Sequence, residues 1–218
     1  QLKLAALGRL TANIAHEIRN PLSAISHAAE LLDEGQARVD QIRLTRIIRD
    51  NTMRLDRLVS DVLQLNRRDR VEAERIHLNE WLEGFLEEFA RNESVAPERL
   101  TLEAAEAWVR FDRGHLHQVL WNLLRNAVRH STRATGSVRF VVRVVANQVE
   151  LNVMDDGPGV SKFTQGQLFE PFFTTYIAGT VLGLSLALEL CAANRARPQY
   201  VRDTPGGHSR VVYDGARA

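Results

Sequence analysis

Cysteine is the scarcest reactive residue in this sequence, since Cys191 is the only one among 218 residues. No intramolecular disulfide can form, which fits a reducing compartment because disulfides persist mainly in oxidising ones. Long apolar runs are also lacking. The longest candidate, VLGLSLALELCAA, is interrupted by Glu189 and falls short of the roughly 18 residues that a membrane-spanning helix needs.

A charge excess of one sign is absent as well. The formal net charge of +1 gives no reason to expect nucleic acid as the main partner. The length suits one domain with a good core or two small ones. No signal peptide is recognisable, and the chain opens on QLKLAALGRL, without Met and already in helical register. We therefore expect a piece of a longer protein, with any membrane anchor upstream.

The first 65 or so residues carry two helical patterns. Apolar residues recur every three or four positions from Leu7 to Leu32, and again from Leu44 to Leu65. The glycine-containing stretch DEGQARVD, residues 33–40, separates them. Two helices with one apolar stripe each cannot shield those stripes alone, so we expect a hairpin that pairs with a second copy as a four-helix bundle.

After the charged connector RRDRVEAERI, residues 67–76, the sequence pattern changes to alternating helix and strand signals. The patterns predict an α+β domain in which an antiparallel sheet faces helices. The expected helices are NEWLEGFLEEFA, DRGHLHQVLWNLLRNAVRHS and a segment around 182–194, and the expected strands are LTLEA, WVRF, SVRFVVRVVA, QVELNVMD and segments around 199–214.

The stretch AHEIRNPL, residues 15–22, places a histidine beside an acid on the first helix. At about 100° per residue His16 points away from the apolar stripe, Glu17 can accept its proton, and Asn20 lies one turn on. Pro21 cannot donate to the carbonyl of Glu17, so we expect the helix to bend or loosen there. A lone exposed histidine is usually an ordinary surface residue, but the whole arrangement favours a phosphoryl-acceptor site.

The stretch NLLRNAVRH, residues 122–130, spaces Asn122, Asn126 and His130 one turn apart on one helix face. Amide oxygens suit Mg²⁺, a hard cation, and asparagine is not favoured in helix interiors. Two interpretations remain open from these residues, a metal–phosphate site and an ordinary solvated polar face.

The stretch DDGPG, residues 155–159, follows a predicted strand. Asp155 can accept a hydrogen bond from an exocyclic amine such as that of adenine, while Gly157 and Gly159 let the backbone come close to a ligand. The same residues also make an ordinary turn.

Two further stretches complete the set. FEPFFTT, residues 169–175, is an aromatic cluster that ends in two threonines, and GTVLGLSLALEL, residues 179–190, is a glycine-containing turn leading into a helix. Free N–H groups and the positive end of the helix dipole make that start an anion site. A plain helix start with Thr180 near the N-cap is the alternative.

These motifs resemble the boxes of bacterial sensor histidine kinases, in the family's order. AHEIRNPL resembles the H box, NLLRNAVRH the N box, DDGPG the G1 box, FEPFFTT the F box and GTVLGLSL the G2 box. The resemblance spans essentially the whole chain. It implies a dimerisation and histidine-phosphotransfer hairpin (1–68), a linker (69–76) and a catalytic ATP-binding domain of the Bergerat (GHKL) type (77–218). The implied fold class is an α hairpin, dimerising as a four-helix bundle, followed by an α/β sandwich of an antiparallel or mixed sheet against helices.

The resemblance also implies roles. His16 would take the γ-phosphoryl group of Mg-ATP, Glu17 would act as its base, and Asn20 would position water for dephosphorylation of a response regulator. Asn126 would ligate Mg²⁺, and Asp155 would read adenine. The other nucleotide-binding residues that it implies are Asn122, His130, Gly157, Gly159, Phe169, Phe173, Thr174, Thr175, Gly179, Thr180, Leu182, Gly183 and Leu184.

The partners implied are a second copy of the chain and a response-regulator receiver domain, with the NtrC type as a candidate. No nucleic acid is expected. Within the family, the chain looks most like PilS-type pilus-regulating kinases, followed by NtrB-type kinases. The resemblance implies a cytoplasmic portion of a protein anchored in the bacterial inner membrane.

Val181 departs from the family pattern, which has a glycine there. A β-branched residue resists the backbone geometry of that position, at about 1–3 kcal/mol, or roughly tenfold to a hundredfold in nucleotide binding. Two hypotheses follow, an active kinase with phosphatase activity, and a nucleotide-impaired dimeric scaffold or phosphatase. We favour the first because the H-box, N-box and G1 residues are intact.

Overall fold

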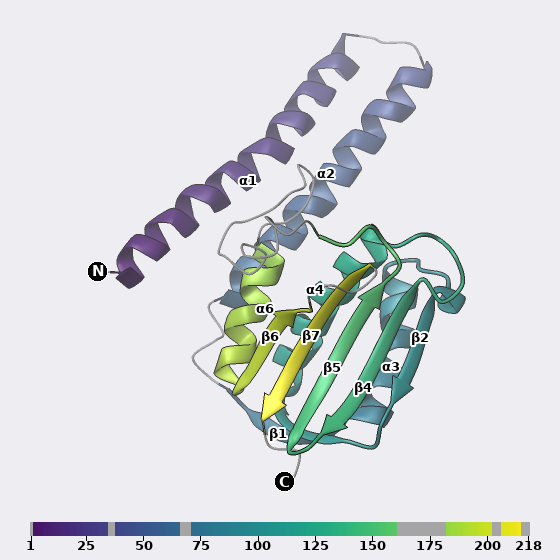
Figure 1. Cartoon of the computed structure of the whole chain (residues 1–218). Coiled ribbons are helices and arrows are strands. Elements are labelled where there is room, and N and C mark those ends of the chain that lie inside the picture. Colours follow the sequence, from purple (N-terminus) through teal and green to yellow (C-terminus); the bar gives the residue numbers. More distant parts are fainter. Residues whose placement is uncertain (1, 35–37, 66–70, 161–181, 202–205, 215–218) are drawn as a thin grey trace. The chain divides into compact units, whose positions relative to one another are not determined.

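The computed structural model describes residues 2–34, 38–65, 71–160, 182–201 and 206–214 (Figure 1). Within its helices, the side chains of residues 2–14, 16–17, 38–39, 57, 60–65, 182–183 and 185 are left undescribed. The chain folds into two compact units, and the first break between them follows residue 67. Among the described residues, no helix is long and apolar enough to cross a membrane.

The first unit is a helical hairpin of α1 (Leu2–Asp33) and α2 (Arg38–Leu65). Helix α1 runs without interruption through Pro21, which is buried. Of the hairpin side chains that the structure describes, Ala28, Leu44 and Leu58 form the buried hydrophobic core. Among the hairpin side chains that the structure describes, the large apolar ones that remain exposed are Leu22, Ile42, Met53 and Val59.

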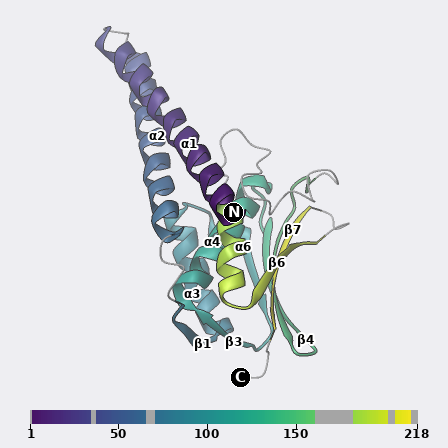
Figure 2. The same cartoon turned by 90° about the vertical axis from the view of Figure 1, so that its left-hand side faces the viewer.

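The second unit is a two-layer sandwich. Its five-stranded sheet has the order β2 (Leu100–Ala104), β4 (Val138–Val145), β5 (Gln148–Asp155), β7 (Gly207–Asp214) and β6 (Ala196–Tyr200). Strands β2 and β4 are parallel and the other neighbours are antiparallel, so the sheet is mixed. Helices α3 (Leu78–Asn92), α4 (Arg113–His130) and α6 (Leu182–Ala193) lie on one side of it (Figure 2).

Strand alternation determines which face of the sheet meets the helices. In register, Val153, Leu151 and Val149 of β5 lie beside Phe140 and Val142 of β4, and all five are at most 2% exposed. The helix layer on that side contributes buried apolar residues from α3, α4 and α6, including Leu82, Phe85, Phe89, Leu116, Leu120, Leu123, Leu124, Leu186, Ala187 and Leu190. The predicted fold class of a helical hairpin followed by a mixed α/β sandwich is confirmed, while its dimeric bundle stays a prediction.

The charged connector contains a strand that the sequence did not indicate. Strand β1 (Ala73–His77) pairs with β3 (Trp108–Asp112) as a separate two-stranded antiparallel ribbon. Its only fully buried residue is Ile76, so the alternation signal was weak. Residues 73–76 of the expected linker therefore lie in a strand, and the domain bounds stay a prediction. The expected strand WVRF pairs with β1 in this ribbon rather than with the main sheet.

Candidate functional site

The helix that carries the predicted metal and phosphate residues is α4. The Asp112 carboxylate caps it by accepting a hydrogen bond from the His115 backbone N–H at 3.0 Å. The apolar face of the helix is buried against the sheet as predicted. Along the helix Asn122 is buried, Asn126 is half-buried and His130 is exposed. The helix therefore leads from the core to the surface, and Asn126 lies at the transition.

The acid of the DDGPG turn, Asp155, ends strand β5. Its Oδ1 accepts hydrogen bonds from the backbone N–H groups of Gly157 at 3.0 Å and Gly207 at 3.3 Å. Burial nevertheless raises the pKa of this carboxyl, against the lowering effect of both bonds. Asp155 is thus a partly buried acceptor held in place by backbone donors.

Gly206 and Gly207 lie directly against Asp155, with no room for a side chain. A Cβ on Gly207 would lie 2.1 Å from Asp155 Oδ2, and one on Gly206 would lie 2.0 Å from the Asp155 carbonyl oxygen. Gly206 also has φ +83°, a conformation that favours glycine. Sequence reasoning missed this pair, although two adjacent glycines before a strand were a usable signal.

The G1 turn and the end of the N-box helix touch each other. A Cβ on Gly157 would lie 2.3 Å from the His130 carbonyl oxygen. Thr132, just after α4, donates its backbone N–H and its hydroxyl to the Asp156 carboxylate at 2.8 and 2.6 Å, and these bonds lower the pKa of Asp156. Two segments 25 positions apart in the sequence (155 − 130) therefore form one wall.

Arg99 and Tyr200 support this wall, and neither was among the predicted residues. The Arg99 guanidinium donates to the Ser131 hydroxyl at 3.0 Å and to the Thr132 carbonyl at 2.9 Å. The Tyr200 hydroxyl accepts from the Val160 backbone N–H at 3.1 Å, and burial raises the pKa of Tyr200. Both act at long sequence separation, so no local motif could have indicated them.

A buried asparagine joins α6 to the start of α4. Asn194 Oδ1 accepts from the Asp112 backbone N–H at 2.8 Å, and its Nδ2 lies 3.0 Å from His115 Nδ1. Both side chains are less than 10% exposed. Cys191, within α6, is buried, which raises its pKa to about 12 and keeps the thiol protonated.

Within the described ranges, no group of three or more His, Cys, Asp or Glu side chains could hold a metal ion. Asn126 offers an amide oxygen, which fits Mg²⁺ as one ligand among several. The wall of Asp155 and glycines likewise fits a planar heterocycle with an exocyclic amine.

Comparison with known proteins agrees with the order of the motifs. Residues 6–70 match the His Kinase A (phospho-acceptor) domain, and residues 111–214 match the histidine kinase-, DNA gyrase B- and HSP90-like ATPase domain. The sensor protein kinase PilS of Pseudomonas aeruginosa is 45% identical over 222 residues, covering 98% of this chain.

This chain belongs to the sensor histidine kinases.

The family is one of protein-histidine kinases, and the chain spans 42% of the length of PilS. Among solved structures, the Acinetobacter baumannii histidine kinase AdeS has a TM-score of 0.72 at 23% identity, covering 93% of this chain and 98% of that one. ShkA, solved in complex with AMPPNP, has a TM-score of 0.63 at 25% identity, covering 96% of this chain and 46% of that one. The expected family and the resemblance to PilS-type kinases are confirmed.

The structure describes the predicted residues of this histidine kinase unevenly. His16, Glu17 and Asn20 lie on α1, Asn20 is exposed, and the side chains of His16 and Glu17 are outside the described part. Leu184 is half-buried on α6, where Leu182 and Gly183 are described by backbone alone. Phe169, Phe173, Thr174, Thr175, Gly179, Thr180 and Val181 lie outside the described residues.

Proposed function

We propose that this chain is the catalytic core of a sensor histidine kinase that phosphorylates its own His16 from ATP and passes the phosphoryl group to a response regulator. The observation that carries the proposal is the wall formed where Gly157 of the G1 turn meets the end of the N-box helix at the His130 carbonyl. The two boxes must meet for one nucleotide to contact both.

Adenine recognition is assigned to Asp155. Its carboxylate is partly buried and already accepts two backbone hydrogen bonds, so its remaining acceptor capacity suits a single exocyclic amine. Gly157 and Gly159 keep side chains out of the adenine plane. AMPPNP in the complex of the related ShkA supports ATP as the nucleotide.

Asn126 is assigned to Mg²⁺. The half-buried amide at the surface end of α4 supplies an uncharged oxygen, with Asn122 and His130 on the neighbouring turns. A Mg²⁺ ion held there would neutralise phosphate charge.

At the H box, His16 is the nucleophile. The Nε2 lone pair forms a bond to the γ-phosphorus while the bond from that phosphorus to the bridging oxygen breaks, and ADP leaves with the electron pair. Glu17 accepts the Nδ1 proton of the imidazole, which prevents a positive charge from accumulating on the phosphorylated ring. The exposed Asn20, one turn from His16, positions water when the phosphorylated regulator is dephosphorylated.

The partners follow from the hairpin. A second copy of the chain would cover its exposed apolar residues, and a receiver domain, with the NtrC type as a candidate, would accept the phosphoryl group from His16. Attachment to the bacterial inner membrane, which would make this chain a cytoplasmic portion, stays a prediction.

The test is incorporation of label from γ-labelled ATP with Mg²⁺, on the parent chain and on His16→Gln. We expect acid-labile, alkali-stable label on the parent and none on His16→Gln. Undiminished label on His16→Gln would exclude His16 as the acceptor and overturn the mechanism.

Val181 supports a second candidate, a nucleotide-impaired dimeric scaffold or a phosphatase alone. The same assay on Val181→Gly separates the two functions. Label on Val181→Gly but not on the parent would establish the second candidate. Equal label on both would establish the kinase and assign Val181 no effect.

A further inference from the structure

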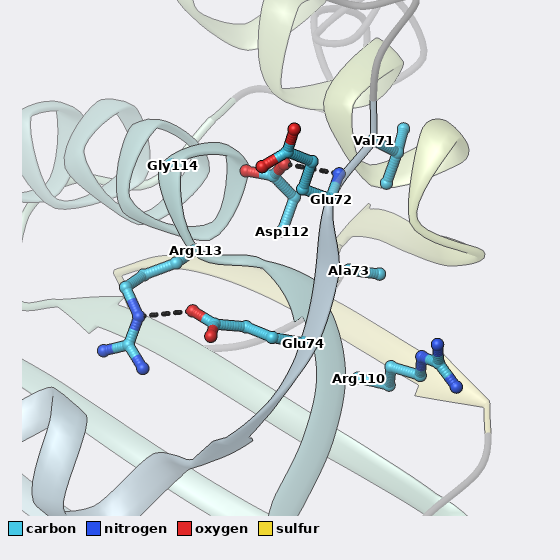
Figure 3. Close-up of a pocket in the computed structure, with 8 residues that line it drawn as sticks. All are labelled: Val71, Glu72, Ala73, Glu74, Arg110, Asp112, Arg113 and Gly114. Carbon is cyan, nitrogen blue, oxygen red and sulfur yellow. Dashed lines mark hydrogen bonds and ion pairs between the residues drawn. The ribbon is translucent and has the colours of Figure 1, made fainter.

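A cavity of about 690 Å³ lies in the second unit, away from the proposed nucleotide site (Figure 3). It is lined by Val71, Glu72, Ala73, Glu74, Arg110, Asp112, Arg113 and Gly114. These residues surround the first turn of α4, whereas Asn126 lies 13 residues further along that helix (126 − 113), or about 20 Å at 1.5 Å per residue. The cavity therefore needs an explanation of its own.

The β1–β3 ribbon forms one side of this cavity and has two unlike faces. One face buries Ile76, Val109 and Phe111, each at most 2% exposed. The opposite face carries Ala73, Arg75 and His77 from β1 with Trp108, Arg110 and Asp112 from β3, because side chains alternate along a strand. Asp112, the last residue of β3, caps α4, so we call the other five residues the outer ribbon face.

Two arginines oppose each other on the outer ribbon face. Arg75 and Arg110 are direct register partners, both are exposed, and like charges in that relation destabilise a strand pair. The Arg75 guanidinium lies 4.6 Å from the Trp108 ring centroid. In the part of the chain that is described, neither guanidinium forms an ion pair with a carboxylate. The ribbon thus retains a like-charge pair, with one acid, Asp112, on the same face by register.

The acids near the two arginines have other partners, and Glu106 Oε1 lies 2.6 Å from His77 Nε2 on the outer ribbon face. Glu74 pairs with Arg113 at 2.6 Å, and Asp112 accepts from the backbone N–H groups of Glu72 and His115. Figure 3 shows the Glu74–Arg113 pair projecting to one side of the strand, and Arg110, with Val71 and Ala73, projecting to the other. Within the described residues, the side of Arg110 therefore combines positive charge with small apolar side chains.

Aromatic and apolar surface borders the two arginines. Trp108 and Val71 are each 38% exposed, and the His77 ring stacks on Trp108 at 4.7 Å. Trp and Arg are the residues most enriched at binding hot spots. A guanidinium fork matches a carboxylate through two parallel hydrogen bonds. The surface therefore complements a segment that carries carboxylates beside apolar side chains.

We propose that the outer ribbon face, with the adjoining cavity, binds an acidic peptide segment of a partner protein. Its carboxylates pair with Arg75 and Arg110, and an apolar side chain between them enters the cavity beside Val71 and Ala73. The cavity volume is within the range that holds a ligand of this size. The proposal goes beyond the kinase reaction and does not depend on nucleotide.

The experiment measures fluorescence anisotropy of a labelled peptide of alternating glutamates and leucines, without ATP, at about 150 mM salt, where nonspecific attraction is screened. The parent chain is compared with Arg75→Glu, Arg110→Glu and Arg91→Glu, the last an exposed arginine of α3 in the same unit. We expect the two ribbon variants to bind at least about tenfold more weakly, while Arg91→Glu binds within about twofold of the parent.

Thermal unfolding separates lost binding from lost folding. Arg110→Glu places opposite charges across the ribbon, so its unfolding midpoint stays the same or rises while peptide binding falls. A peptide with glutamine in place of glutamate should not bind the parent.

Three results would overturn the proposal. The first is unchanged peptide affinity in a folded Arg110→Glu variant. The second is an equal loss in Arg91→Glu, which would mean nonspecific charge attraction. The third is binding of inorganic phosphate as tight as that of the peptide, with displacement of the peptide, which would make this a small-anion site.

Discussion

The two units of this kinase differ in how completely they bury their apolar side chains. The sandwich closes its core within one chain, and Phe89, Phe111 and Phe140 are at most 1% exposed. The hairpin leaves Ile42 63% and Val59 50% exposed. Large apolar patches on a soluble surface mark interaction sites. The unit proposed to bind ATP therefore buries its own core, whereas the proposed phosphotransfer unit needs a second surface to cover its apolar side chains.

The largest loss of stability and of nucleotide binding is expected where the backbone around Asp155 leaves no room for a side chain. Gly206→Val places a Cβ 2.0 Å from the Asp155 carbonyl oxygen at φ +83°, so we expect a loss of about 3 kcal/mol or more in the free energy of unfolding. Binding of a fluorescent ATP analogue should fall at least about tenfold. Calorimetry and titration of the analogue measure the two effects.

Gly84→Ala is the matched control. Gly84 lies in α3 with nothing within 4 Å of an added Cβ, so this change should stabilise by about 0.5–1 kcal/mol. Similar losses in both variants would contradict the packing argument.

The stability of the sandwich should depend on pH through His208. Burial, followed by Arg210 and Arg143, lowers the pKa of His208 from 6.5 to about 4, and its buried Nδ1 has no partner in the described structure. The unfolded chain binds this proton at higher pH than the folded one, so stability is lost as pH falls from about 6.5 towards 4. Between pH 7 and pH 5 the loss is about 2 kcal/mol.

Denaturant unfolding at both pH values measures this loss on the parent and on His208→Gln. The glutamine variant should lose about 2 kcal/mol less on acidification. His27→Gln in the hairpin, where the histidine is exposed, should behave like the parent. An unchanged pH dependence in His208→Gln would exclude His208 as the titrating group.

A smaller loss in the free energy of unfolding is expected where α6 joins α4. Asn194→Ala leaves the buried Asp112 N–H and His115 ring nitrogen without their partner, which should lower the free energy of unfolding by about 1–2 kcal/mol. The KM for ATP should rise more than kcat falls, because the helix positions are altered while the H box is untouched. Asn92→Ala, at the exposed end of α3, is the control, and an equal change there would refute the link.

The smallest effect on the folding of a single chain is expected on the hairpin. Ile42→Asp replaces an exposed side chain, so it should change the free energy of unfolding of the sandwich by no more than about 0.5 kcal/mol. Self-association should weaken instead, which sedimentation equilibrium measures. Arg46→Asp, on the same helix, controls for added charge. An unchanged association constant would argue against a dimer through this surface.

Much of the fold was predictable from local pattern. The expected helices over NEWLEGFLEEFA and DRGHLHQVLWNLLRNAVRHS, and the strand pair from SVRFVVRVVA to QVELNVMD, are confirmed within a few residues. Strand β1 was missed because Ile76 is its only fully buried residue. The contacts of Arg99, Tyr200, Asn194 and Gly206 with the candidate site were also missed, because each joins positions far apart in the chain.

Residue types at short spacing were enough to identify the family, the order of the boxes and most of the helices and strands. Tertiary structure alone decided that Gly157 meets the His130 carbonyl, that backbone N–H groups from two turns hold Asp155, and that Arg75 faces Arg110. The physical reason is that strand register and helix packing set these contacts, and both depend on the whole core rather than on any local motif.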